Sequence, residues 1–137
     1  MTLDDVFQAV TKKIATAFPS AKIYGEEVQQ GLKYPAFFVY LVPIINSNET
    51  ERRTYSRVSI KIVYMLEKKS NSAYRKMTDD LNKLFKLYFP AGDRVLEIYD
   101  KTSQVIDDSL NFSFDVSFYE IEFAEQYELM QTLQTDI

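Results

Sequence analysis

The chain has 137 residues, 46% hydrophobic and 15% aromatic, and its 16 basic and 20 acidic side chains give a net charge of -4. This length predicts one domain, residues 1–137, that buries roughly two thirds of its unfolded surface. The aromatic content is typical of a folded chain. Cysteine and histidine are absent, which excludes disulfides, thiolate nucleophiles, imidazole catalysis and the usual zinc ligands.

Charge is unevenly distributed along the chain. Residues 1–101 hold all 16 basic residues and 12 acids, whereas residues 102–137 hold eight acids and no base. Such segregation would orient one copy against the next, and a solvated acidic end is the equally simple alternative. The first residues are acidic where a secretory signal is basic, and the longest apolar run, 36–45, is too short to span a bilayer. We therefore expect a protein of a cytoplasm-like compartment.

The first element expected is a helix over residues 3–18. Its apolar residues recur every three or four positions and form one stripe, namely Leu3, Val6, Phe7, Val10, Ile14, Ala17 and Phe18. Thr2 is a suitable N-cap, and two acids follow it at the positive end of the helix dipole. Pro19 ends the helix, and a short strand is expected at 22–25.

Two β-prone segments, 36–42 and 55–66, flank a mostly polar stretch. We expect an antiparallel pair whose connection is too long for a tight turn, with residues 45–54 forming a projecting hairpin loop. The first segment is continuously apolar, which predicts that both of its faces are covered, whereas the second alternates and has one packed face. Projecting loops commonly make contacts, and the pair Ile44–Ile45 at the root of this one is a candidate contact surface.

A second helix is expected over residues 70–89. Its apolar stripe contains Tyr74, Met77, Leu81, Leu84, Phe85 and Tyr88. A turn at 90–93, a short strand at 94–99 and a polar segment at 101–109 should follow.

The last predicted strand starts at Leu110 and alternates strongly. Its inward residues are Leu110, Phe112, Phe114, Val116 and Phe118. The phase changes at Tyr119, which predicts a bulge or a strand that leaves the sheet. The C-terminal tail, 124–137, has apolar residues at helical spacing and predicts a short helix that must dock on something.

No catalytic or phosphate-binding motif occurs, and only three glycines are available for one. The one chemical alternative is a carboxylate Mg²⁺ site built from Asp107, Asp108 and Asp115, because hard oxygen ligands suit that ion. We therefore expect no enzyme activity and no cofactor, and we keep a small carboxylate-dependent metal enzyme as an alternative.

The order of elements resembles one known family. The segments that carry the resemblance are Phe18-Pro19, Ile23-Tyr24-Gly25-Glu26, Gln29-Gln30-Gly31-Leu32-Lys33, Pro35 to Val39, Arg53-Thr54-Tyr55, Ile62-Val63-Tyr64, the Phe-rich last strand and Met130. Together they span nearly the whole chain, and they resemble the tail terminator family of bacteriophages and phage-like elements, prophages included, in the form found in Gram-positive hosts.

The resemblance implies an α+β fold, with a small mixed or antiparallel sheet, a long β-hairpin, and N-terminal, central and short C-terminal helices. It also implies a structural virion protein at the head-proximal end of the tail. Such a protein forms a ring, typically a hexamer, that caps the tail tube, ends tail polymerisation and joins the tail to the head or neck.

The partners implied are further copies of the chain, the tail tube protein, a neck or head-completion protein and, in a contractile tail, the sheath protein. DNA would pass through the lumen without specific binding. The contact residues expected on this basis are Ile44, Ile45, Asn46, Glu49, Glu51, Arg52, Arg53 and Arg57, with Glu120, Glu122 and Glu125 as acidic counterparts. Another head–tail connector, a stopper or completion protein, is the alternative in the same setting.

Overall fold

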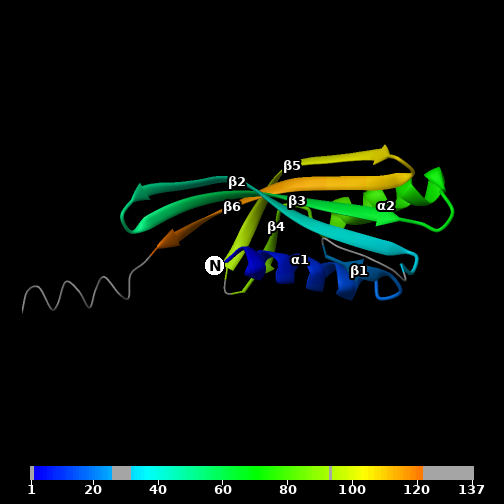
Figure 1. Cartoon of the computed structure of the whole chain (residues 1–137), viewed down its shortest axis with the longest axis horizontal. Helices are drawn as coiled ribbons and strands as arrows, with labels where there is room; N and C mark the ends of the chain where they lie inside the picture. Colours follow the sequence, from blue (N-terminus) through cyan, green and yellow to red (C-terminus); the bar gives the residue numbers. More distant parts are fainter. Residues whose placement is uncertain (1, 26–31, 93, 122–137) are drawn as a thin grey trace, which may run out of the picture.

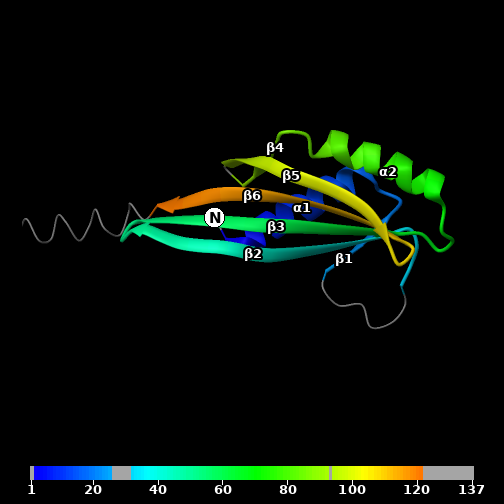
Figure 2. The same cartoon turned by 90° about the horizontal axis from the view of Figure 1, so that it is seen from above.

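The structure, a computed structural model, describes residues 2–25, 32–92 and 94–121. In chain order its elements are α1 (Leu3–Ala17), β1 (Lys22–Tyr24), β2 (Ala36–Thr50), β3 (Arg53–Met65), α2 (Asn71–Leu84), β4 (Tyr88–Ala91), β5 (Arg94–Ile106) and β6 (Ser109–Ile121). The six strands form one sheet in the order β1-β2-β3-β6-β5-β4. Only β1 and β2 pair in parallel, and the other neighbours are antiparallel, so the mixed sheet expected from the sequence is confirmed (Figures 1 and 2).

The core lies on one face of this sheet. The inward residues of β3 and β6 pair directly across the strands, for example Ile60 with Phe114 and Ile62 with Phe112, and all four are buried. Both helices pack on this face, where the ring of Phe85 at the end of α2 lies 4.8 Å from that of Phe114. The alternation read from the sequence therefore identified the packed face correctly.

The N-terminal helix is confirmed, and it ends at Ala17, with Phe18 as C-cap. Its buried residues are Val6, Val10 and Ile14. At its start the Thr2 hydroxyl accepts a hydrogen bond from the Asp5 N–H, and the Asp5 carboxylate accepts one from the Thr2 N–H. These reciprocal bonds form a capping box, which satisfies amide groups that have no partner within the helix. The bond from Thr2 lowers the pKa of the Asp5 carboxyl.

Two predictions about β2 and β3 were wrong. The polar stretch is not a loop: β2 continues to Thr50, β3 begins at Arg53, and only Glu51 and Arg52 form the turn. Polar residues are compatible with strands here because this part of the hairpin lies beyond the helices and has no core to cover. The apolar start of β2 is not covered on both faces either, since Phe37 and Val39 are buried while Phe38 and Tyr40 stay partly exposed.

The second half of the chain also differs from the prediction in where its elements begin and end. The second helix ends at Leu84, and Tyr88 is the exposed first residue of β4, not part of the helical stripe. Strand β5 runs to Ile106, through residues expected to be a polar connection, and Asp107 and Asp108 form the turn to β6 with positive φ angles of 50° and 61°. Two helices are present among the described residues, and the short C-terminal helix expected at 124–137 lies outside them.

Strand β6 shows no bulge at the change of phase. Its pairing with β3 runs without a shift from Leu110 to Ile121. Tyr119 is exposed because it lies on the face opposite the core. It belongs to the part of β6 that continues past its last pair with β5, Ser117 with Glu97.

Candidate assembly interface

A three-stranded arm projects from the body of the molecule. We define it as residues 44–56 of β2 and β3 together with residues 118–121 of β6, which pair with residues 53–56. Figure 1 shows the arm extending beyond the N-terminal end of α1, and Figure 2 shows that it extends past the ends of both helices. A projecting structure is therefore present, as ordered strands and not as the expected loop.

Polar side chains link neighbouring strands of the arm. The Asn46 Nδ2 donates to the Ser56 Oγ at 3.1 Å, and the Thr54 hydroxyl donates to the Asn48 Oδ1 at 2.9 Å. At the tip the Arg52 N–H donates to the Thr50 hydroxyl at 3.2 Å. These cross-strand bonds hold the hairpin in one register where no hydrophobic core does so.

A second group of side chains on the arm is aromatic and cationic. The rings of Tyr55 and Tyr119 lie 5.2 Å apart, and the Arg53 guanidinium lies 4.1 Å from the centre of the Tyr119 ring. The Arg53 Nε also lies 3.4 Å from the Glu49 carboxylate. The contact residues Arg53 and Glu49 are thus brought together within one copy of the chain.

At the base of the arm a charged cluster joins three strands. The Arg57 guanidinium donates to Asp115 at 2.6 Å and to Asp100 at 2.8 Å, and lies 4.7 Å from the centre of the Tyr99 ring. The hydrogen bond to Asp115 raises the pKa of Arg57, and burial raises the pKa of the Tyr99 phenol. The Arg57 charge is therefore held by two carboxylates of its own chain.

The root of the arm carries the exposed apolar pair. Ile44 is 50% exposed and Ile45 is 41% exposed. The pairing shifts between Pro43 and Ile45, so a bulge interrupts the strand at this point. A hollow of about 200 Å³ brings Ile45 together with the predicted residues Asn46 and Glu120. Glu122 and Glu125 lie outside the described residues.

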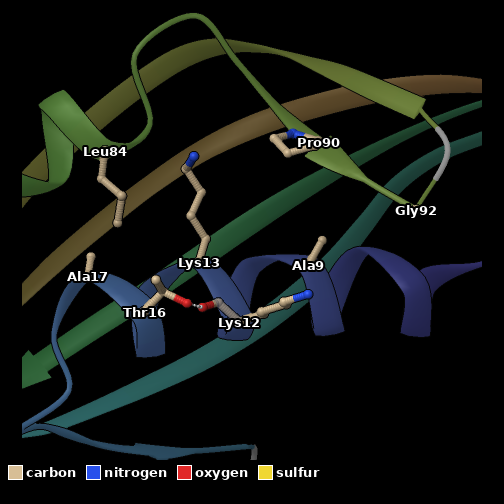
Figure 3. A pocket seen from close by; sticks show the side chains of 8 residues that line it. All are labelled: Ala9, Lys12, Lys13, Thr16, Ala17, Leu84, Pro90 and Gly92. Atoms are coloured by element: carbon tan, nitrogen blue, oxygen red, sulfur yellow. Dashed lines mark hydrogen bonds between the residues drawn. The ribbon is translucent and has the colours of Figure 1, made fainter.

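A second hollow, of about 510 Å³, lies between α1 and β4 and contains none of the predicted contact residues (Figure 3). It is lined by Ala9, Lys12, Lys13, Thr16, Ala17, Leu84, Pro90 and Gly92. Figure 3 shows Lys13 pointing from α1 toward the space between Leu84 and Pro90. The described lining offers two ammonium groups and no carboxylate, and the Thr16 hydroxyl donates to the Lys12 carbonyl. This arrangement supplies no acid–base pair for catalysis.

Two of the three aspartates of the alternative metal site have separate ionic partners. The Asp108 carboxylate lies 3.2 Å from the Lys69 ammonium, and Asp115 is bonded to Arg57. Across residues 2–25, 32–92 and 94–121, no group of three acidic side chains is arranged to hold a metal ion. In the same ranges no helix is both long and apolar enough to cross a membrane.

A sequence model described as phage tail terminator protein matches residues 5–128. The chain belongs to the phage tail terminator family. Phage tail terminators are structural proteins of the virion tail, and this membership associates the chain with other tail proteins. The match names the tail terminators and not another head–tail connector, so the resemblance read from the sequence is confirmed at the level of the family.

Comparison with other proteins adds evidence on the fold. One solved structure, whose name states no function, matches with a TM-score of 0.51 over 90% of this terminator and 97% of its own chain. The two share 15% sequence identity, so the likeness shows the fold alone. No curated protein matches the chain.

Sequence reasoning missed one group of surface residues in this tail terminator. Leu87, Tyr88 and Val95 are among the most exposed large apolar side chains of the described structure. Tyr88 was expected on the apolar stripe of the second helix and therefore in the core, and its neighbour Leu87 was not singled out. For Val95 a signal was present, because in a strand that buries Leu96 and Ile98 the alternation places Val95 on the outer face.

Proposed function

We propose that this tail terminator caps the head-proximal end of the tail tube, ends tube polymerisation and forms a hexameric ring that joins the tail to the neck and head. Its partners on this proposal are further copies of the chain, the tail tube protein, a neck or head-completion protein and, in a contractile tail, the sheath protein. A Gram-positive host remains a prediction from the resemblance. The observation that carries the proposal is the projecting arm with Ile44 and Ile45 exposed at its root.

The arm is built for contact with another molecule. It has no core of its own, and its strands are held together by backbone pairing and by side-chain bonds such as that between Asn46 and Ser56. An ordered extension loses little conformational freedom when it binds, so more of the contact energy appears as affinity. The half-exposed Ile44 and Ile45 provide apolar area that a neighbour can cover.

The charge of the chain suits a ring through which DNA passes. The net charge of -4 disfavours tight binding of phosphates. Arg57, a cation on the open face of the sheet, is bonded to Asp115 and Asp100. A ring wall of this kind would let DNA slide, and the function requires no catalytic step.

The test is tail length in a phage that lacks this gene and is complemented with variants. Wild-type protein should restore tails of uniform length, whereas the double variant Ile44→Glu/Ile45→Glu should give overlong or variable tails in electron micrographs. Substitution is preferable to removal of the hairpin tip, because β3 within the arm also pairs with β6.

The chain offers a matched control for this test. Val105 and Ile106 are 42% and 44% exposed and lie at the opposite end of the sheet, beside the β5–β6 turn. Val105→Glu/Ile106→Glu adds the same charge and should leave tail length uniform. Normal tails from the Ile44→Glu/Ile45→Glu variant, incorporated at the wild-type level, would contradict the proposed role of the arm.

A further inference from the structure

The hollow of about 510 Å³ between α1 and β4, the α1–β4 hollow, has largely apolar walls. Figure 3 shows Leu84 and Ala17 near one end of it, and Pro90 and Gly92 toward the other. In the described structure a Cβ atom added at Gly92 would have nothing within 4 Å apart from its chain neighbours, so the hollow is open at that end. A space of this size can receive several side chains of a bound segment.

The charges that line the α1–β4 hollow are positive. Lys12 is exposed and Lys13 is half-buried, and neither ammonium group has an ionic partner among the residues that the structure describes. Asp5 and Asp80, one helical turn before lining residues of α1 and α2, are not part of the lining, and Asp93 lies outside the described residues. The hollow therefore suits an occupant that is both apolar and acidic.

Other hollows in the described part of the chain suit such an occupant less well. The one beside Lys83 and Lys101 contains Asp79 and no apolar side chain. Those at the start of α1 and at the root of the arm contain Asp4 and Glu120, respectively. The hollow on the other side of α1 has a single lysine. Only the α1–β4 hollow among them combines apolar walls with two cations and no acid.

The chain itself has a segment of matching chemistry, residues 122–137, which lies outside the described residues. Its charged residues are all acids, namely Glu122, Glu125, Glu128 and Asp136. Its large apolar residues are Phe123, Tyr127, Leu129, Met130, Leu133 and Ile137. A segment this short with apolar residues at helical spacing is expected to be stable only when it is docked on a surface.

This segment starts close to the α1–β4 hollow of its own copy. Strand β6 ends at Ile121, and the carbonyl of Tyr119, two residues earlier, accepts a hydrogen bond from the Arg94 guanidinium. Arg94 follows Gly92 by two residues, so β6 ends near the open end of the hollow. An extended segment of this length reaches about 50 Å, more than twice the roughly 22 Å of α1, and can cover the whole hollow.

We infer that residues 122–137 of each copy pack into its own α1–β4 hollow. The apolar side chains of the segment contact Ala9, Leu84 and Pro90, and its carboxylates lie beside Lys12 and Lys13. This site binds a short acidic and apolar peptide, and that peptide is the C-terminal segment of the same chain. The inference does not depend on the proposed ring, because the hollow contains none of the contact residues of the arm.

Cysteine cross-linking of the purified full-length protein tests the inference, because the chain has no native cysteine. The double variant Thr16→Cys/Gln131→Cys places one thiol in the lining of the hollow and one in the segment, and keeps every apolar and acidic residue of the segment. Treatment of a dilute sample with a short bismaleimide should give a cross-linked monomer, identified by its migration and by the masses of its peptides.

The matched control is Ala15→Cys/Gln131→Cys. Ala15 is the exposed neighbour of Thr16 on α1 and lines the hollow on the other side of the helix. This variant should give a several-fold lower yield of cross-linked monomer. Equal yields from the two variants, or no cross-link from either, would show that the segment does not occupy the α1–β4 hollow and would overturn the inference. Cross-linked dimers in place of monomers would show that another copy supplies the segment, and would also overturn it.

Reversal of the two positive charges tests the choice of this hollow. Adding Lys12→Glu/Lys13→Glu to the Thr16→Cys/Gln131→Cys variant should lower the yield several-fold, because modest attractions become repulsions. Lys61→Glu/Lys76→Glu makes the same change of charge at exposed positions outside the lining and should leave the yield unchanged. An equal effect of the two reversals would contradict the inference, while tail length in the complemented phage would still test the capping function separately.

Discussion

Stability should reside in the body of the molecule and not in the arm. Phe114, in the central strand β6, is the best residue for testing this, because its ring is fully buried. The centre of its ring lies 4.8 Å from that of Phe85 and 5.9 Å from that of Phe112. Phe114→Ala should lower the free energy of unfolding by about 3 to 5 kcal/mol, the usual cost of a large cavity in a packed core. For a chain of this size that corresponds to a fall in Tm of roughly 10 to 20 °C.

The matched substitution in the arm is Ile44→Ala. Half of the Ile44 side chain is exposed, so its removal should cost about 1 kcal/mol or less. Urea unfolding followed by circular dichroism measures both variants against wild type, with the slope of the transition as a check on two-state behaviour. Equal losses for Ile44→Ala and Phe114→Ala would show that the arm is part of the core and would refute the reasoning.

Three further predictions concern single residues. Gly92 has a φ angle of 62° with free space around it, so Gly92→Ala should cost about 1 to 2 kcal/mol in urea unfolding, through backbone strain alone. The buried Tyr74 hydroxyl donates to the Asp108 carbonyl at 2.6 Å, and Tyr74→Phe should cost about 1 to 3 kcal/mol by leaving that group unsatisfied. Because the folded state lowers the pKa of Asp5, its cap contributes stability at neutral pH that is lost as the pH falls through that lowered value. Thermal melts between pH 7 and pH 2 should show a shallower acid dependence for Asp5→Asn.

The packed half of the fold could be predicted because its apolar residues recur at regular intervals. Val58, Ile60 and Ile62 alternate with polar residues, and Phe112, Phe114 and Val116 do the same. One covered face requires a period of two, so the buried set followed from the sequence. The first helix followed for the same reason, from a stripe with a period near 3.6.

The outer part of the arm could not be predicted as strand because residues 46–50 are exposed and cover no core. Segments 46–50 and 101–106 are mostly polar, and polarity in a sequence is typical of loops, yet in the structure both are held by backbone pairing with a neighbouring strand. The Asp107–Asp108 turn was missed as well. Positive φ at two successive positions is usually marked by Asn-Gly or Asp-Gly, and here two aspartates adopt it.

The candidate interface was predictable in part. The exposure of Ile44 and Ile45 was expected from their place beside a polar stretch, and it was found. The cluster of Arg57 with Asp115 and Tyr99 was not expected, because it depends on the register of β3, β6 and β5, which the sequence does not display. The exposure of Leu87 and Tyr88 was not expected either, because it depends on where α2 ends, which is a matter of tertiary packing.

The central claim is that the arm of this tail terminator contacts another molecule at the end of the tail. Cryo-electron microscopy of intact tails tests it most directly. The account predicts a ring of this chain on the last layer of the tube, with residues 44–56 of each copy buried against a neighbouring copy or the tube. A ring whose arms extend into solvent, or a tube end without this chain, would contradict it.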